Sequence, residues 1–172
     1  MTEEIQKAVA YKLEQVVDSN DVQLISHVLW HDYLPKDAAA MSELFKDNTR
    51  NLGLCGSRVW VSNIKFIGDS SGKIIGKKAD VEFDFIFSNA NAGETGFEGT
   101  AEQQFLTICG GVMTEFIEPQ NINPHDVLGS GLSSNSVEVG SLDSAQFSKF
   151  NKFMDGKAVF MMTCKLKAIQ SV

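Results

Sequence analysis

The spacing of apolar residues changes along the chain, from helical steps to strand alternation. In residues 3–17 the apolar positions fall at three- and four-residue steps, at Ile5, Val9, Leu13, Val16 and Val17. This spacing predicts an amphipathic helix. A second helix is expected from the apolar side formed by Leu24, Ile25, Val28 and Leu29. A third is expected from about Asp37, ending at Asn51-Leu52-Gly53.

From Arg58 the period becomes two, which is typical of strands. One strand is expected before a hairpin turn at Gly68–Gly72, and the next runs from about Lys73 to Ser88. The second strand has the clearest alternation, with Glu82 and Asp84 facing away from Val81, Phe83, Phe85 and Phe87. After a turn at 89–96 we expect a strand at about 99–109, a tight turn or bulge at Gly110-Gly111, and a returning strand at 112–117.

The last third of the chain has a different composition. Residues 119–142 contain no Lys or Arg and many Ser, Asn and Gly, so we expect a long loop. A short helix at about 143–154 and a final strand at 158–169 follow. The 172 residues therefore predict one α+β domain, with N-terminal helices on a curved antiparallel sheet and an additional C-terminal helix and strand.

Composition narrows the function classes. A formal net charge of −7 disfavours nucleic acid as a partner, because phosphate binding needs a basic surface. Five Lys between Lys149 and Val172 form either a local patch for an acidic partner or a solvated face. The three Cys lack disulfide or zinc spacing. No signal region and no apolar run of about 20 residues are present, so we expect a soluble cytoplasmic protein without membrane contact.

Two motifs suggest binding chemistry and do not meet its requirements. His27 and His31 have the i, i+4 spacing of metal-binding helices, but Val28 stands where zincins have Glu. His125 could complete a three-histidine site, and the alternative is histidines at a helix surface. The Gly68–Lys73 segment lacks phosphate-loop spacing, because three residues separate its glycines and Ile74 follows the Lys. We therefore expect neither a metal nor a cofactor.

The densest polar and aromatic cluster is Trp30-His31-Asp32-Tyr33. His31, Asp32 and Tyr33 are candidates for general acid–base catalysis if they face a pocket. The alternative is a helix C-terminal turn, where the dipole favours His and the aromatic rings cover the edge of the core. Asp84 and Glu102 are further candidate catalytic carboxylates. The twelve Phe favour a core or an apolar pocket, and the candidate lining residues are Trp30, Trp60, Phe83, Phe85 and Phe105.

Residues 9–118 resemble the NTF2-like superfamily, which includes SnoaL-like cyclases and ketosteroid isomerase relatives. The resemblance rests on two short leading helices, on His31-Asp32-Tyr33-Leu34-Pro35 before a third helix, and on the long strands. Gly110 to Phe116 is similar to that family's last hairpin. The resemblance to this family implies a cone-like sheet around an apolar pocket that holds a carboxylate or His, often in a dimer. Residues 119–172 depart from it, because many members end near residue 119.

Two functions follow as expectations. The first is a domain that either binds a small apolar ligand or carries out cofactor-independent acid–base chemistry of the isomerase, cyclase or dehydratase type, with Val81, Phe83, Phe85 and Phe87 facing a cavity. The second is a non-enzymatic structural or assembly subunit, for example of a viral or phage particle or another homo-oligomer. The absence of a catalytic signature is compatible with the second function and does not select it.

Overall fold

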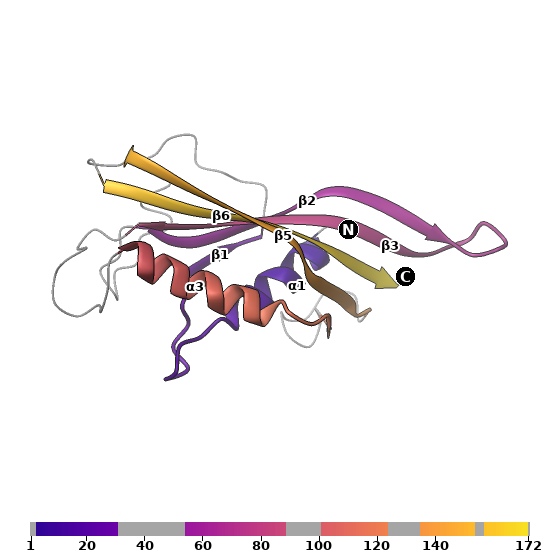
Figure 1. The fold of residues 1–172 in the computed structure, drawn as a ribbon. Coiled ribbons are helices and arrows are strands. Elements are labelled where there is room, and N and C mark those ends of the chain that lie inside the picture. The colour runs from indigo at the N-terminus through magenta and orange to yellow at the C-terminus, as the bar shows by residue number, and fades with distance from the viewer. Residues whose placement is uncertain (1–2, 31–53, 89–100, 124–134, 154–156, 172) are drawn as a thin grey trace.

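The computed structural model describes residues 3–30, 54–88, 101–123, 135–153 and 157–171. Within these residues the fold is α+β, with two helices and one six-stranded sheet (Figure 1). The elements are α1 (Glu3–Glu14), β1 (His27–Leu29), β2 (Leu54–Gly68), β3 (Ile74–Ser88), α3 (Ala101–Glu115), β4 (Gln120–Ile122), β5 (Val137–Phe153) and β6 (Lys157–Ser171).

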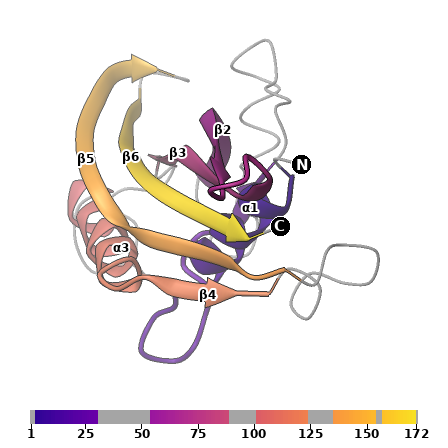
Figure 2. The same ribbon diagram turned by 90° about the vertical axis from the view of Figure 1, so that its right-hand side faces the viewer.

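The strands follow the order β1-β2-β3-β6-β5-β4. Only the short β1 runs parallel to its neighbour, and the other pairs are antiparallel. The C-terminal strand β6 therefore lies inside the sheet, between β3 and β5. The sheet is curled, and β5 and β6 bend along their length (Figure 2).

Four of the predicted elements are confirmed: the first helix, the two strands joined at Gly68–Gly72, and the last strand. The hairpin turn is closed by the carboxylate of Asp69, which accepts hydrogen bonds from the backbone N–H groups of Ser71 and Lys73. Gly72 has a φ of 82°, a conformation that favours glycine. The turn chemistry visible in the sequence thus fixes this hairpin.

The predicted second helix is wrong, because His27–Leu29 form the strand β1 beside β2. After α1 the chain turns back on itself, and the backbone N–H of Leu24 donates to the carbonyl oxygen of Val16. This reversal commits the following residues to an extended path along the sheet edge. In so short a segment, the spacing of the apolar residues is compatible with a helix or with a strand.

The predicted strands at 99–109 and 112–117 are also wrong, since α3 runs without interruption from Ala101 to Glu115. Its buried apolar residues have the i, i+3, i+4, i+7 spacing of a helix: Phe105, Ile108, Cys109 and Val112. Gly110-Gly111 is not a turn. A Cβ on Gly111 would lie 3.0 Å from Cγ1 of Val16, so the missing side chain lets this part of α3 approach the end of α1.

The helix predicted at 143–154 is wrong as well, because residues 143–153 belong to β5. The pairing of β5 with β6 places Phe147 opposite Met162. The strand is irregular near Gly140, where a Cβ would lie 2.7 Å from the carbonyl oxygen of Lys167. The expected loop at 119–142 contains β4 and the start of β5, and residues 124–134 lie outside the described residues. So do the predicted third helix and the turn at 89–96.

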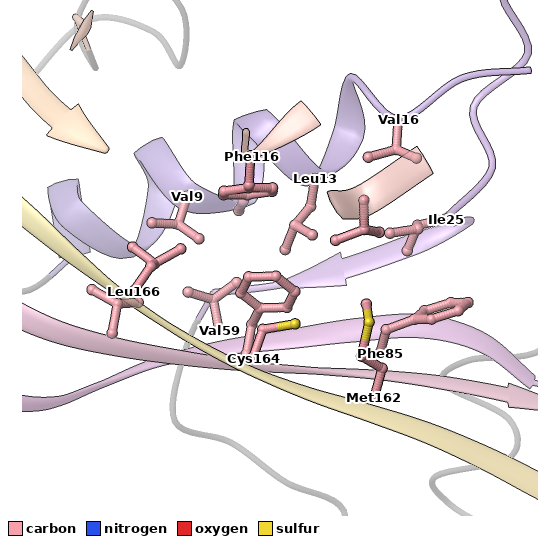
Figure 3. Packing of buried hydrophobic residues seen from close by; sticks show 14 of the residues in the cluster. Val9, Leu13, Val16, Ile25, Val59, Phe85, Phe116, Met162, Cys164 and Leu166 are labelled. Carbon is pink, nitrogen blue, oxygen red and sulfur yellow. The ribbon is translucent and has the colours of Figure 1, made fainter. Parts of the chain in front are cut away.

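Both described helices pack on one face of the sheet and form the core with it (Figure 1). Figure 3 shows Val9 and Leu13 of α1 above Phe85, Cys164 and Leu166 of the sheet. Alternation along the strands puts charged and polar residues on the opposite face, which we call the open face, and a small apolar cluster lies at one end of it: Leu29, Leu54, Ile86 and Val159. On the neighbouring strands β2, β3 and β6, the residues of this face include Arg58, Trp60, Glu82, Asp84, Thr163 and Lys165.

Candidate functional site

Asp84 is the best-connected candidate carboxylate. It lies on the open face, between Arg58 of β2 and Thr163 of β6 in the sheet register. The hydroxyl of Thr163 donates a 2.7 Å hydrogen bond to Oδ1 of Asp84. Nη2 of Arg58 lies 3.5 Å from Oδ2 of the same carboxylate. Strand register, which places three distant segments side by side, builds this cluster.

Burial raises the pKa of Asp84, whose side chain is only 14% exposed. The hydrogen bond from Thr163 and the charge of Arg58 oppose that shift, while the negative charge of Glu82 adds to it. The net direction is upward, so Asp84 holds a proton at higher pH than an exposed aspartate does. Such a group can exchange protons or hydrogen-bond a polar ligand.

The neighbours of this cluster are also paired. The guanidinium of Arg58 lies 4.2 Å from the ring centroid of Trp60, a cation–π geometry. Nζ of Lys165 lies 3.5 Å from a carboxylate oxygen of Glu82. Trp60, a predicted pocket residue, thus lies on the open face, among the charged residues around Asp84.

The three predicted pocket phenylalanines come together on the other face, in the core. The rings of Phe85 and Phe105 stack with centroids 5.7 Å apart. Phe105 also stacks on Phe160 at 5.3 Å, and Phe83 lies 5.3 Å from Phe116. All of these side chains are at most 5% exposed. They contact one another and the helices as packed core residues do.

Trp30 lies at the edge of that core, with Nζ of Lys7 above its ring at 4.2 Å. Glu102 is exposed in the first turn of α3, where its carboxylate lies 3.8 Å from Nζ of Lys149. Since α3 covers the core face and Asp84 is on the open face, the sheet separates these two carboxylates. The structure therefore does not bring them into one site.

The remaining candidates are only partly covered. His31, Asp32, Tyr33 and His125 lie outside the described residues. His27 is half-buried on β1. Among the residues that the structure describes, no three His, Cys, Asp or Glu side chains form a group that could hold a metal ion.

Sequence reasoning missed Arg58 and Thr163 as the partners of Asp84. Thr163 is 79 residues away in the chain, and only strand register brings the two together. The alternation in 81–87 could have identified the face of Asp84, but no local pattern gives the register of β6 against β3.

A scan against models of known protein families and a search of curated proteins both found no match to this chain. Within the described residues, no helix has the length and apolarity needed to cross a lipid bilayer.

Proposed function

We propose that this chain is a non-enzymatic structural or assembly subunit that works by association with further copies. The observation that carries this proposal is a projecting β-hairpin with exposed apolar side chains. Residues 63–78, the hairpin arm, comprise the end of β2, the turn and the start of β3. Figure 1 shows the hairpin extending beyond the rest of the sheet.

The rest of the protein covers the apolar side chains of the hairpin arm only in part. Pairing between β3 and β6 ends at Gly76 and Ser171, so the outer part of the arm has only two strands. Four large apolar residues of the arm have high exposed fractions: Phe66 57%, Ile67 37%, Ile74 49% and Ile75 45%. A two-stranded hairpin is marginal in water, and apolar surface gains about 25 cal/mol per Å² on burial. A partner that covers this arm would supply both support and affinity.

The interior supports the same proposal. The expected pocket residues Phe83, Phe85 and Phe105 pack against other rings and the helices. The carboxylates Asp84 and Glu102 are on opposite sides of the sheet. Acid–base chemistry in an apolar pocket needs one such carboxylate at the wall of a Phe-lined cavity, whereas an assembly subunit needs neither a cavity nor a carboxylate in it.

The test is sedimentation velocity on the purified chain across a hundredfold range of concentration. We expect the mass to rise with concentration or to settle at a defined oligomer. The double variant Phe66→Ser, Ile74→Ser should shift the chain to monomer and keep its fold, because both side chains are exposed. The matched control is Leu106→Ser, which removes another half-exposed apolar side chain, from α3. A wild-type monomer at every concentration would overturn the proposal.

The second candidate function is the small-molecule domain with acid–base chemistry, as the NTF2-like resemblance implies. One observation favours it: Asp84 combines a raised pKa with fixed contacts to Thr163 and Arg58. Native mass spectrometry of protein purified from its own source tests it. A bound molecule lost in Asp84→Asn and retained in Glu102→Gln would support this function. A chain without any bound molecule would contradict it.

A further inference from the structure

We propose, on the basis of the assembly function above, that the hairpin arm of one copy docks on an acidic surface of a second copy, head to tail. That surface, the acidic end, lies where the C-terminal ends of α1 and α3 meet. It comprises the residues Val17, Asp18, Asp21, Val22, Met113, Glu115, Ile117 and Glu118. The two surfaces carry opposite charge, and both expose large apolar side chains.

The hairpin arm is basic in an acidic protein. Residues 63–78 hold four Lys and one Asp, a net charge of +3. Since the whole chain has a formal net charge of −7, the remaining residues together carry −10. Lys65, Lys73 and Lys78 are exposed, and Lys77 is buried. The one acid, Asp69, has its carboxylate occupied by the N–H groups of the turn. The arm therefore presents ammonium groups beside its exposed apolar side chains.

The acidic end is made up of two segments, the turn after α1 and the end of α3 with the residues just beyond it. The position of Gly111 on α3 is within contact distance of Val16 and Leu24, which flank the turn after α1. From the α1 side, Nζ of Lys12 donates a hydrogen bond to the carbonyl oxygen of Glu118, just beyond α3. Figure 1 shows the two helices side by side under the sheet. Contacts from both helices thus hold the acidic end together.

The chemistry of the acidic end complements the arm. Residues 13–30 and 101–123 contain no Lys or Arg at all. Four large apolar side chains are exposed there, as on the arm: Val17 41%, Val22 50%, Met113 41% and Ile117 73%. Four carboxylates accompany them, and one of these, Asp18, already accepts hydrogen bonds from the backbone N–H groups of Asn20 and Val22. Opposite charge around apolar contacts sets the orientation of two partners and speeds their encounter.

The location of the two surfaces requires two copies. In Figures 1 and 2 the β2–β3 hairpin and the indigo turn after α1 project in different directions from the body. One copy would then use its arm on a neighbour and offer its acidic end to another. Such a heterologous contact builds a ring when the rotation closes and a filament when it does not.

Complementation between two charge variants tests the docking. The arm variant is Lys65→Glu, Lys73→Glu, and the acidic-end variant is Asp21→Asn, Glu118→Lys, all at exposed positions. Asn suits position 21, where φ is 58°. Each variant alone should raise the dissociation constant for self-association by about tenfold or more. Mixed together, they should form a dimer and nothing larger, because each copy keeps one working half of the interface.

The outcomes separate this inference from the assembly function. The control pair Lys149→Glu, Glu138→Lys reverses exposed charges elsewhere on β5 and should leave self-association within about twofold of wild type. If the wild type assembles and both charge variants assemble equally well, the docking proposal is overturned and the assembly function stands. If mixing restores no dimer, the contact is not head to tail. If the wild type never assembles, both proposals fail.

A disulfide cross-link locates the contact. The three native thiols are buried, so cysteines added at exposed positions react without competition. Ile74→Cys protein mixed with Ile117→Cys protein should give a mixed disulfide dimer under mild oxidation, in excess over either homodimer. A statistical mixture of homodimers and heterodimers would overturn the proposed docking.

Discussion

Nζ of Lys12 donates a 3.2 Å hydrogen bond to the backbone carbonyl oxygen of Glu118. The lysine is 1% exposed, and its ammonium group also lies 4.7 Å from the ring centroid of Phe116. A side chain from α1 thus satisfies a carbonyl just after α3, where no intrahelical donor remains. Two segments more than 100 residues apart are joined by this bond.

This buried ammonium group should make stability depend on alkaline pH. Burial lowers the pKa of Lys12, and the charge of Glu115 opposes that shift. The unfolded chain therefore binds more protons above the folded pKa, so unfolding free energy rises with pH from the lowered pKa up to the ordinary value of 10.5. Lys12→Met removes this effect. We expect the unfolding free energy of Lys12→Met, measured relative to wild type by urea denaturation, to be highest at pH 7 and to fall by pH 9.5.

The control for this prediction is Lys7→Met, which removes a lysine from the same helix that pairs with Glu3 near its surface. If Lys7→Met shows the same pH-dependent difference from wild type as Lys12→Met, the effect does not come from the burial of Lys12. An equal pH dependence for Lys12→Met and wild type would show that Lys12 titrates in the folded protein as it does in the unfolded chain.

Adjacent glycines in α3 should respond oppositely to alanine. Nothing lies within 4 Å of a Cβ added at Gly110, so Gly110→Ala should stabilise the protein by about 0.5–1 kcal/mol through helix propensity. At Gly111 the new Cβ would lie 3.0 Å from Cγ1 of Val16. We expect Gly111→Ala to gain nothing or to destabilise. Thermal unfolding of the two variants checks this, and an equal gain at both positions would contradict the close approach of α1 and α3.

The same glycine pair explains part of what the sequence could not predict. Glycine is costly inside a helix, so the pair Gly110-Gly111 favours a turn between strands in a prediction from sequence. The helical spacing of Phe105, Ile108, Cys109 and Val112 was present in the sequence and would have given the right structure. The reason for glycine at position 111 is a tertiary contact with α1, which no local pattern contains.

Prediction succeeded where the local pattern was long and the turn chemistry explicit. The alternation at 81–87 and the turn residues Asp69 to Gly72 predicted β3 and its hairpin correctly. It failed at β5, where Phe147, Phe150 and Phe153 have three-residue spacing that is typical of a helix. Pairing with β6 overrides that spacing. For the candidate site, the face of Asp84 could be predicted, and its partner Thr163 could not.

Phe105 should be a major stability determinant. Its ring contacts four others, those of Phe85, Phe87, Phe147 and Phe160, and it is 2% exposed. Phe105→Ala should lower the unfolding free energy by about 3–5 kcal/mol, through lost burial and a cavity. The matched variant Phe147→Ala removes a half-exposed ring and should cost roughly 1 kcal/mol or less. Similar losses in urea denaturation would mean that Phe105 does not join α3 to the sheet.

The cysteines should be unreactive in the folded protein. Burial raises the pKa of Cys109 and of Cys164 to about 12 each, with the negative charges of Cys164 and Asp84, respectively, adding to the shift. Cys55 is also buried, and its thiol donates to the carbonyl oxygen of Leu24 at 3.1 Å. Since the thiolate is the reactive form, a disulfide reagent at pH 8 should label none of them quickly and all three after unfolding. Fast labelling of the native chain would contradict this.

The position of β6 inside the sheet has a consequence for how the chain folds during synthesis. Residues 157–171 supply core side chains such as Met162, Cys164 and Leu166, and they join β3 to β5. A ribosome releases them after the other described elements, so α1 and the β2–β3 hairpin emerge early without the strand that closes their core. Pairing across so many intervening residues is slow. The nascent chain therefore carries β3 without its neighbouring strand, and a core that lacks the side chains of β6, until translation has passed the last strand, which is the stage at which chaperones would bind it.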